Sequence, residues 1–287
     1  MVIITAHLSL AQTFTEKISR ELAFEKQSNA NALVVANING SVKVVSYDGE
    51  NVLIEVTRSI KAKTEARLEQ GKSEIQLRIL DRADTLILYV QDGCHEFRKN
   101  ANRQSGWHHH GWSYESRSKD DCNPPYDYKM DFTVKVPQAL NLLLTTVNNG
   151  DIVVEHVDGV VKAGNINGSV RLVNLKSQAV VHTINGDVDI DYAENPAKDC
   201  RFYTLNGDIN ALFQPGLSAN LSFESFNGNF YTNIAKIENL PLKLERSTKG
   251  EELRYKINGN LYRVGQGGTL LDFETFNGNV YLKEKTR

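Results

Sequence analysis

The sequence lacks several features on which common functions depend. Its charges nearly cancel, with 33 Lys and Arg against 35 Asp and Glu, and no Lys/Arg stretch forms the basic stripe that is typical of a nucleic-acid partner. No apolar run approaches the ~20 residues that span a bilayer. Neither His-Glu-x-x-His nor Cys-x-x-Cys occurs, and there are only three cysteines. What remains is a chain of 287 residues with ordinary hydrophobic content, long enough for one large all-β domain or two smaller ones.

One short phrase recurs through the second half of the chain. It consists of an apolar residue, Asn-Gly, a small polar residue and another apolar residue. The asparagines of seven consecutive copies are 18, 18, 21, 21, 31 and 19 residues apart, and a near-constant period of this size is typical of a solenoid. The corner residues are Asn149 and Gly150, Asn167 and Gly168, Asn185 and Gly186, Asn206 and Gly207, Asn227 and Gly228, Asn258 and Gly259, Asn277 and Gly278, with an isolated eighth pair at Asn39 and Gly40.

The residues that follow each corner predict how the copies stack. The residue two positions after each glycine is always apolar, and side chains two apart in a strand share a face. Stacked copies would therefore share one continuous core. At the corner, glycine permits a left-handed backbone and asparagine side chains can hydrogen-bond along the stack. Because parallel crossovers are overwhelmingly right-handed, we expect an all-β, right-handed parallel β-solenoid (β-helix) of about 18–21 residues per coil.

Departures from the period define the expected organisation. Residues 1–12 are apolar and favour the remnant of a secretory signal over a short strand, and residues 13–30 form a weakly helical lead-in. Residues 31–140 form an N-terminal β unit with a short helix over 61–72 and a long irregular insertion at 91–125. Residues 141–287 are the solenoid repeats, continuous with that unit. An excursion is expected at 234–249, and the charged residues 283–287 suit an exposed last coil.

Several of these segments together resemble a known family. Residues 183–188 read Thr-Ile-Asn-Gly-Asp-Val, residues 37–44 read Asn-Ile-Asn-Gly-Ser-Val-Lys-Val, and Tyr-Asp-Gly-Glu follows at 47–50. With the helix and the Val-Lys-Val-Pro segment at 134–137, they are similar to the bacterial putative-adhesin β-solenoid family, related to the head GIN domain of putative auto-transporter adhesins. The resemblance covers Leu33 to Leu282 without the insertion. It implies an exported, envelope-associated solenoid, whether periplasmic, at the cell surface or secreted, and implies no catalytic residue.

The insertion is the part of the chain that the repeats do not explain. Cys94 and Cys122 bracket it, and two cysteines flanking a loop of an exported protein favour a disulfide over two unrelated free thiols. Cys200 lies in the repeats and is expected to be a small buried residue or a turn thiol. Closing a loop of this size is worth about 3.5 kcal/mol in the chain-entropy model.

Aromatic and histidine side chains are concentrated between the two cysteines. Trp107, Trp112 and Tyr114, with Phe97, form either an exposed patch for a glycan or protein, or a cluster that packs the loop against the solenoid. His108 and His110 would share a face of an extended segment. Their spacing matches no metalloenzyme motif, so we expect no physiological metal and no cofactor.

An acidic column also follows the corner glycines. Asp151, Asp187 and Asp208 occupy it, but Ser169 interrupts it, and turn chemistry explains both of these residue types. We therefore expect a non-enzymatic exported β-solenoid, an adhesin or surface scaffold and binding module, whose partner is an unknown cell-surface glycan or protein. The oligomeric state stays open. The alternative is a polysaccharide-acting envelope enzyme or an envelope sensor.

Overall fold

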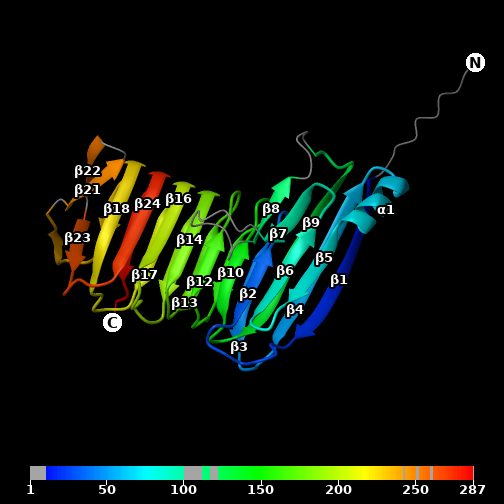
Figure 1. Ribbon diagram of the computed structural model, residues 1–287, viewed down its shortest axis with the longest axis horizontal. Coiled ribbons are helices and arrows are strands. Elements are labelled where there is room, and N and C mark those ends of the chain that lie inside the picture. The colour runs from blue at the N-terminus through cyan, green and yellow to red at the C-terminus, as the bar shows by residue number, and fades with distance from the viewer. Residues whose placement is uncertain are drawn as a thin grey trace, which may run out of the picture.

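The computed structural model describes residues 11–99, 112–116, 122–241, 243–249, 252–258 and 261–286. Within these residues the protein is all-β, with 60% strand and one short helix. Two large sheets share one core, and their strands lie across the long axis of the molecule (Figure 1). Both sheets are open and contain parallel and antiparallel pairs. The all-β part of the prediction is confirmed.

The spatial order of the strands in each sheet differs from their order along the chain. The ten-stranded sheet runs β1 (Gln12–Leu22), β4 (Val52–Ala62), β9 (Tyr126–Pro137), β3 (Val42–Tyr47), β11 (Ile152–Glu155), β13 (Val170–Leu175), β15 (Val188–Tyr192), β17 (Ile209–Phe213), β25 (Val280–Glu284) and β19 (Phe230–Thr232). The eleven-stranded sheet runs β20 (Ile237–Asn239), β23 (Leu261–Val264), β18 (Ala219–Asn227), β24 (Leu270–Asn277), β16 (Cys200–Asn206), β14 (Ala179–Asn185), β12 (Val161–Gly164), β10 (Asn141–Thr145), β2 (Ala32–Ala36), β6 (Thr85–Gln91) and β5 (Gln76–Asp81).

Consecutive strands from β10 to β19 alternate between the two sheets. We call two such strands joined at an Asn-Gly corner a rung. Neighbouring rungs pair in parallel in both sheets. Antiparallel pairs lie at the two ends of the sheets, at β1–β4–β9 and β5–β6 on one side and at β18–β23–β20 on the other. The sheets are therefore mixed, and a closed right-handed solenoid stays a prediction.

The core lies between the sheets and follows the predicted alternation. The residues two positions after the corner glycines are fully buried in five rungs, namely Ile152, Val170, Val188, Ile209 and Val280. From the other sheet, Phe202 and Phe273 pack with ring centroids 5.2 Å apart. Cys200 is buried there, with its Sγ 3.2 Å from the Tyr192 hydroxyl. The apolar columns of the sequence are thus the inward faces of the strands.

A ladder of side-chain amides runs along the exposed side of the corners. Each asparagine donates through its Nδ2 to the Oδ1 of the asparagine in the adjacent rung, at 2.7–2.9 Å. The first corner departs from the prediction, because Asn148 holds the ladder position while Asn149 adopts a left-handed φ of 60°. The ladder runs in the order Asn148, Asn167, Asn185, Asn206, Asn277 and Asn227.

Two further columns of hydrogen bonds support the same corners. A buried threonine two residues before the asparagine donates its hydroxyl to the corner glycine carbonyl of the adjacent rung, as from Thr204 to Gly186 at 2.8 Å. The residue after the glycine accepts a backbone N–H from the next rung, as Asp187 Oδ1 does from Asp208 at 2.8 Å. The acidic column therefore has a structural role, as turn chemistry predicts.

The corner glycines are required by close stacking more than by a left-handed backbone. A Cβ on Gly186 would lie 2.3 Å from the Gly168 carbonyl oxygen, and Gly186 is not among the described residues with positive φ. Gly40 does have a φ of 125°. The expectation of a left-handed corner is thus correct at Gly40 and wrong at Gly186.

The order of the rungs is the main difference from the sequence prediction. The C-terminal rung, β24–β25, lies between β16–β17 and β18–β19, so Asn277 pairs with both Asn206 and Asn227 (Figure 1). The prediction of an exposed last coil is therefore wrong. The prediction for Asn258 is also wrong, because it ends β22 (Glu252–Asn258), which pairs with β21 (Lys243–Lys249) in a separate hairpin. Gly259 lies outside the described residues.

The N-terminal end contains a strand where a helical lead-in was expected. β1 pairs along its whole length with β4, because alternate side chains such as Phe14 and Ile18 turn toward the core. The predicted helix is α1 (Glu65–Glu74), capped by Thr64. Buried Arg58 donates to carbonyls at the C-terminal end of α1 and forms an ion pair with Glu16 at 2.6 Å. The expected signal remnant lies outside the described residues, apart from its last two positions.

Candidate functional site

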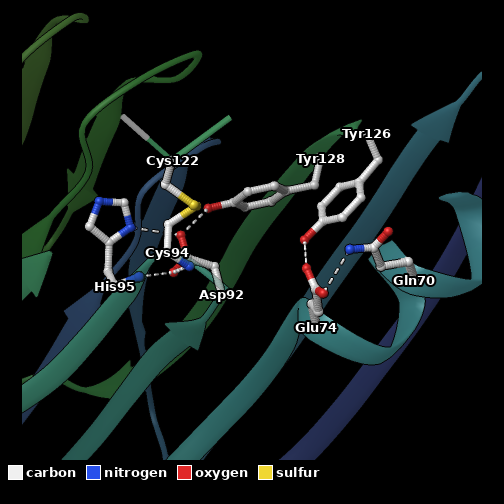
Figure 2. Close-up of a disulfide and its surroundings, with 8 residues drawn as sticks. All are labelled: Gln70, Glu74, Asp92, Cys94, His95, Cys122, Tyr126 and Tyr128. Atoms are coloured by element: carbon white, nitrogen blue, oxygen red, sulfur yellow. Dashed lines mark hydrogen bonds and ion pairs between the residues drawn. A yellow bond between two sulfur atoms is a disulfide. The ribbon is translucent and has the colours of Figure 1, made fainter. Parts of the chain in front are cut away.

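A disulfide closes the insertion that the sequence singles out. Cys94 follows β6 and Cys122 precedes β9, and their sulfur atoms are bonded across a Cα–Cα distance of 5.6 Å (Figure 2). Between them, β7 (His95–Lys99) and β8 (Trp112–Ser116) form an antiparallel hairpin. The insertion thus has its own strand pair where the sequence indicates only irregular chain.

A buried carboxylate fixes the start of the insertion. Asp92 is 4% exposed, and its Oδ1 accepts the backbone N–H groups of Cys94 at 3.1 Å and His95 at 2.7 Å. Its Oδ2 lies 2.8 Å from His95 Nδ1 and 3.3 Å from the Tyr128 hydroxyl (Figure 2). Burial, and then the nearby Asp92 carboxylate, raise the pKa of Tyr128 well above its ordinary value. The phenol therefore stays protonated and donates to Asp92.

A second polar contact lies beside the first, next to α1. The Tyr126 hydroxyl donates to Glu74, and the Gln70 amide donates to the same carboxylate at 3.0 Å (Figure 2). Burial and this carboxylate raise the pKa of Tyr126. The two tyrosines of β9 thus connect the disulfide region to the helix through neutral-to-charged hydrogen bonds.

The described aromatics of the insertion pack against the protein. Phe97 stacks on Tyr89 with centroids 4.6 Å apart and contacts Tyr114 at 5.1 Å. The Tyr114 hydroxyl accepts the Val90 N–H and donates to a backbone carbonyl of Ala36 or Val90. Beneath this hairpin a second apolar cluster, Val34, Ile87 and Leu143, is buried on the outer face of the eleven-stranded sheet. Phe97 and Tyr114 therefore pack the described hairpin onto the sheet, as the second of the two alternatives expects for these two residues.

The other predicted site residues are placed only in part. Trp112 pairs with Lys99 in the hairpin, whereas Trp107, His108 and His110 lie outside the described residues. Within the residues that the structure describes, no three His, Cys, Asp or Glu side chains are grouped to hold a metal. His95 contacts Asp92 rather than a second histidine there. The prediction of a binding patch on this loop stays a prediction.

The structure also contains a groove that sequence reasoning missed. It lies on the outer face of the ten-stranded sheet, has a volume of about 440 Å³, and crosses β13, β15, β17 and β25. The outward side chains that line the groove lie three and five positions after the corner glycines. This spacing can be found in the sequence, but it indicates a groove only when the order of the rungs is known. The outward-pointing side chains are Arg171, Val173, Asp189, Asp191, Asn210, Leu212, Tyr281 and Lys283.

The described part of the chain contains no helix that is both long and apolar enough to cross a bilayer. The sequence matches no family model and no curated protein.

Several solved structures, including the following three, are similar to this chain. A putative cell adhesion protein from Clostridium sporogenes has a TM-score of 0.40 and 12% identity, over 95% of this chain and 100% of that one. A putative adhesin from Bacteroides fragilis has a TM-score of 0.36 and 12% identity, over 94% and 97%. A putative adhesin from Parabacteroides distasonis has a TM-score of 0.29 and 10% identity, over 96% and 97%. At these values the similarity assigns neither a family nor a function to the chain.

Proposed function

We propose that this protein is a non-enzymatic, exported scaffold of the β-solenoid type that presents a binding surface, in the manner of an adhesin. The observation that carries the proposal is the set of three hydrogen-bonded columns at the corners, one between side-chain amides and two between a side chain and the backbone of the adjacent rung. Such columns make the body rigid and use its recurrent polar residues for structure. The remaining surface is two long, outward sheet faces suited to contact with a partner.

The disulfide supports the location of this scaffold. Disulfides persist in oxidising compartments and are rare in the cytosol of mesophiles, so the Cys94–Cys122 bond fits an exported chain. The bond ties the insertion to the core next to buried Asp92, and the described hairpin lies on the sheet behind it. The insertion would thus be a fixed feature of one outer face.

Binding is tested with an array of glycans and matrix proteins. Two proteins are compared: the wild type, and a variant in which residues 100–111 are replaced by a Gly/Ser linker of equal length. This variant keeps β7, β8 and the disulfide, so its fold is preserved, but it removes Trp107, His108 and His110. Selective loss of binding places the contact on the insertion, and retained binding places it on another face.

The same samples separate the scaffold from a polysaccharide-acting enzyme. Soluble polysaccharides are incubated with the wild-type protein, and their chain length is followed by size-exclusion chromatography. We expect no change in chain length together with saturable binding in the array. Shortened polysaccharide, or a wild-type protein that binds nothing in the array, would refute the proposal.

A further inference from the structure

The groove on the outer face of the ten-stranded sheet begins where a stack of aromatic rings ends. Tyr231 and Tyr281 lie side by side on β19 and β25, with centroids 5.2 Å apart and planes 13° apart. The next residue in the same cross-strand row is Asn210 on β17. Because asparagine is shorter than tyrosine, the ring of Tyr281 is left without a third ring beside it, and the groove occupies that space.

Hydrogen-bonding groups of both kinds follow in the same row. Asn210 is followed by Asp189 on β15 and Arg171 on β13, and the Asn210 Nδ2 donates to Asp189 Oδ1 at 2.9 Å. Lys283 lies in the parallel row with its Nζ 5.7 Å from the Tyr281 ring centroid. The row therefore offers an aromatic face, an amide, a carboxylate and a guanidinium within one groove.

The charges and shape of the groove restrict the class of its ligand. The groove is lined by two cationic side chains, Arg171 and Lys283, and two anionic ones, Asp189 and Asp191, whose formal charges cancel. Lys285, at the side of the groove, pairs with Asp191 at 2.6 Å and adds a single positive charge. Neither a polyanion nor a polycation is favoured by such a balance. The groove also crosses four strands. Neighbouring strands lie ~4.8 Å apart, so the groove is about 14 Å long, which suits a linear ligand made of several sugar rings.

Its place on the sheet argues against an extended peptide. Peptides add to sheets at an edge, where unpaired backbone groups are available. Here the floor is made by Leu172, Ile190 and Ala211, which belong to interior strands whose backbones already pair on both sides. Binding must therefore come from side chains and an aromatic face. Sugar hydroxyls both donate and accept hydrogen bonds, and the apolar face of a sugar ring packs on an aromatic ring.

We propose that this groove binds a linear, neutral oligosaccharide, with one sugar ring stacked on Tyr281 above Asn210. The hydroxyls of the following rings bond to Asp189 and Arg171. This site gives the proposed scaffold a ligand class, and it rests on that proposed function. It is separate from the described hairpin of the insertion, which packs on the outer face of the other sheet.

The test uses substitutions that fill the groove without opening the core. Asn210→Tyr continues the tyrosine stack into the space meant for the sugar, and tyrosine is favoured in strands beside another aromatic ring. Arg171→Ala trims one exposed side chain as a second variant. Ser222→Tyr is the matched control, because it adds a tyrosine to the outer face of the eleven-stranded sheet.

Binding is measured by native affinity electrophoresis in gels containing mannan, xylan, starch or hydroxyethyl cellulose, and by calorimetric titration with the matching oligosaccharide. We expect at least one of these neutral chains to retard the wild type and the Ser222→Tyr control equally. Asn210→Tyr should weaken binding by at least about tenfold, the factor that corresponds to 1.4 kcal/mol, and Arg171→Ala should weaken it to a lesser extent.

Two results would overturn the inference. They are no retardation of the wild type by any of these neutral chains, and equal binding by the wild type and a folded Asn210→Tyr variant. If a protein in the array binds the wild type and the Asn210→Tyr variant equally, the proposed oligosaccharide site is refuted but the proposed scaffold function is not. Absence of any partner for the wild type would instead remove the scaffold function.

Discussion

The asparagine ladder makes a stability prediction that depends on position. Asn206 lies inside the ladder, where its Nδ2 donates to Asn185 at 2.9 Å and its Oδ1 accepts from Asn277 at 2.7 Å. Asn227 lies at the far end, and among the described residues its side chain makes a single ladder bond, to Asn277 at 2.8 Å. Replacement by alanine therefore removes two ladder bonds at Asn206 and one at Asn227.

The expected magnitudes follow from the number and burial of these bonds. A net intramolecular hydrogen bond contributes about 0.5–1.5 kcal/mol, and exposed side chains belong to the low end. We expect Asn206→Ala to lower the free energy of unfolding by about 1 kcal/mol and Asn227→Ala by about half as much. Thr204 is fully buried, so Thr204→Val leaves the Gly186 carbonyl without its donor and should cost about 1–3 kcal/mol.

Urea and thermal unfolding followed by circular dichroism measure this order. A loss of 1 kcal/mol lowers the melting temperature by about 2–4 °C in chains of 150–250 residues, and by about 2 °C in a chain of this length. Asn229→Ala is the matched control, since this exposed corner asparagine has no side-chain partner among the described residues. Equal effects of Asn206→Ala and Asn229→Ala would refute a stabilising role of the ladder.

Three further predictions follow from the same structure. Cys94→Ala with Cys122→Ala should cost about 3.5 kcal/mol, and mass spectrometry with and without reductant should show the bond only in the wild type. Burial, and then the charge of Arg201, lower the pKa of His182 in the folded protein. The contribution of His182 to stability is therefore complete above the ordinary histidine pKa near 6.5, and it is lost as the pH falls through the lowered pKa of the folded state. Unfolding at pH 7 and pH 5 should thus differ less in His182→Gln than in the wild type. Truncation after Gly268 removes the inner rung β24–β25, and proteolysis should then release β18–β19 as well, whereas a chain with sequential rungs would lose only its end.

The repeating phrase was sufficient to predict the corners and the core. Any stack of these copies buries residues such as Val170 and Val188 and brings the asparagines together, whichever copy lies next to which. For the same reason the order of the rungs could not be predicted, because every copy offers the same surface to its neighbours. The strand β1 was missed because its alternation includes Glu16, which looks solvent-exposed until Arg58 is placed beside it.

The candidate site was predictable only where a residue type carries its own chemistry. The cysteine pair was visible from its position around the insertion, and the structure joins Cys94 to Cys122. The role of Asp92 was not visible, because it depends on the N–H groups of the turn that it caps and on Tyr128 from a distant strand. Packing of Tyr114 against the sheet likewise depends on the register of the hairpin.

The position of the C-terminal rung decides what the ten-stranded sheet presents to solvent. In a sequential stack, Tyr231 would lie directly beside Asn210, and the strand of Tyr281 would be the exposed edge. Insertion of β25 between β17 and β19 instead joins the two tyrosines and places the second of them at the groove, while Lys285 pairs with Asp191 at its side. It also leaves β19, a strand of three residues, as the sheet edge, which is the short kind of edge that resists pairing with another chain. The position of β25 therefore has two consequences. It supplies the aromatic end of the groove, and it leaves the short strand β19 as the edge of the ten-stranded sheet.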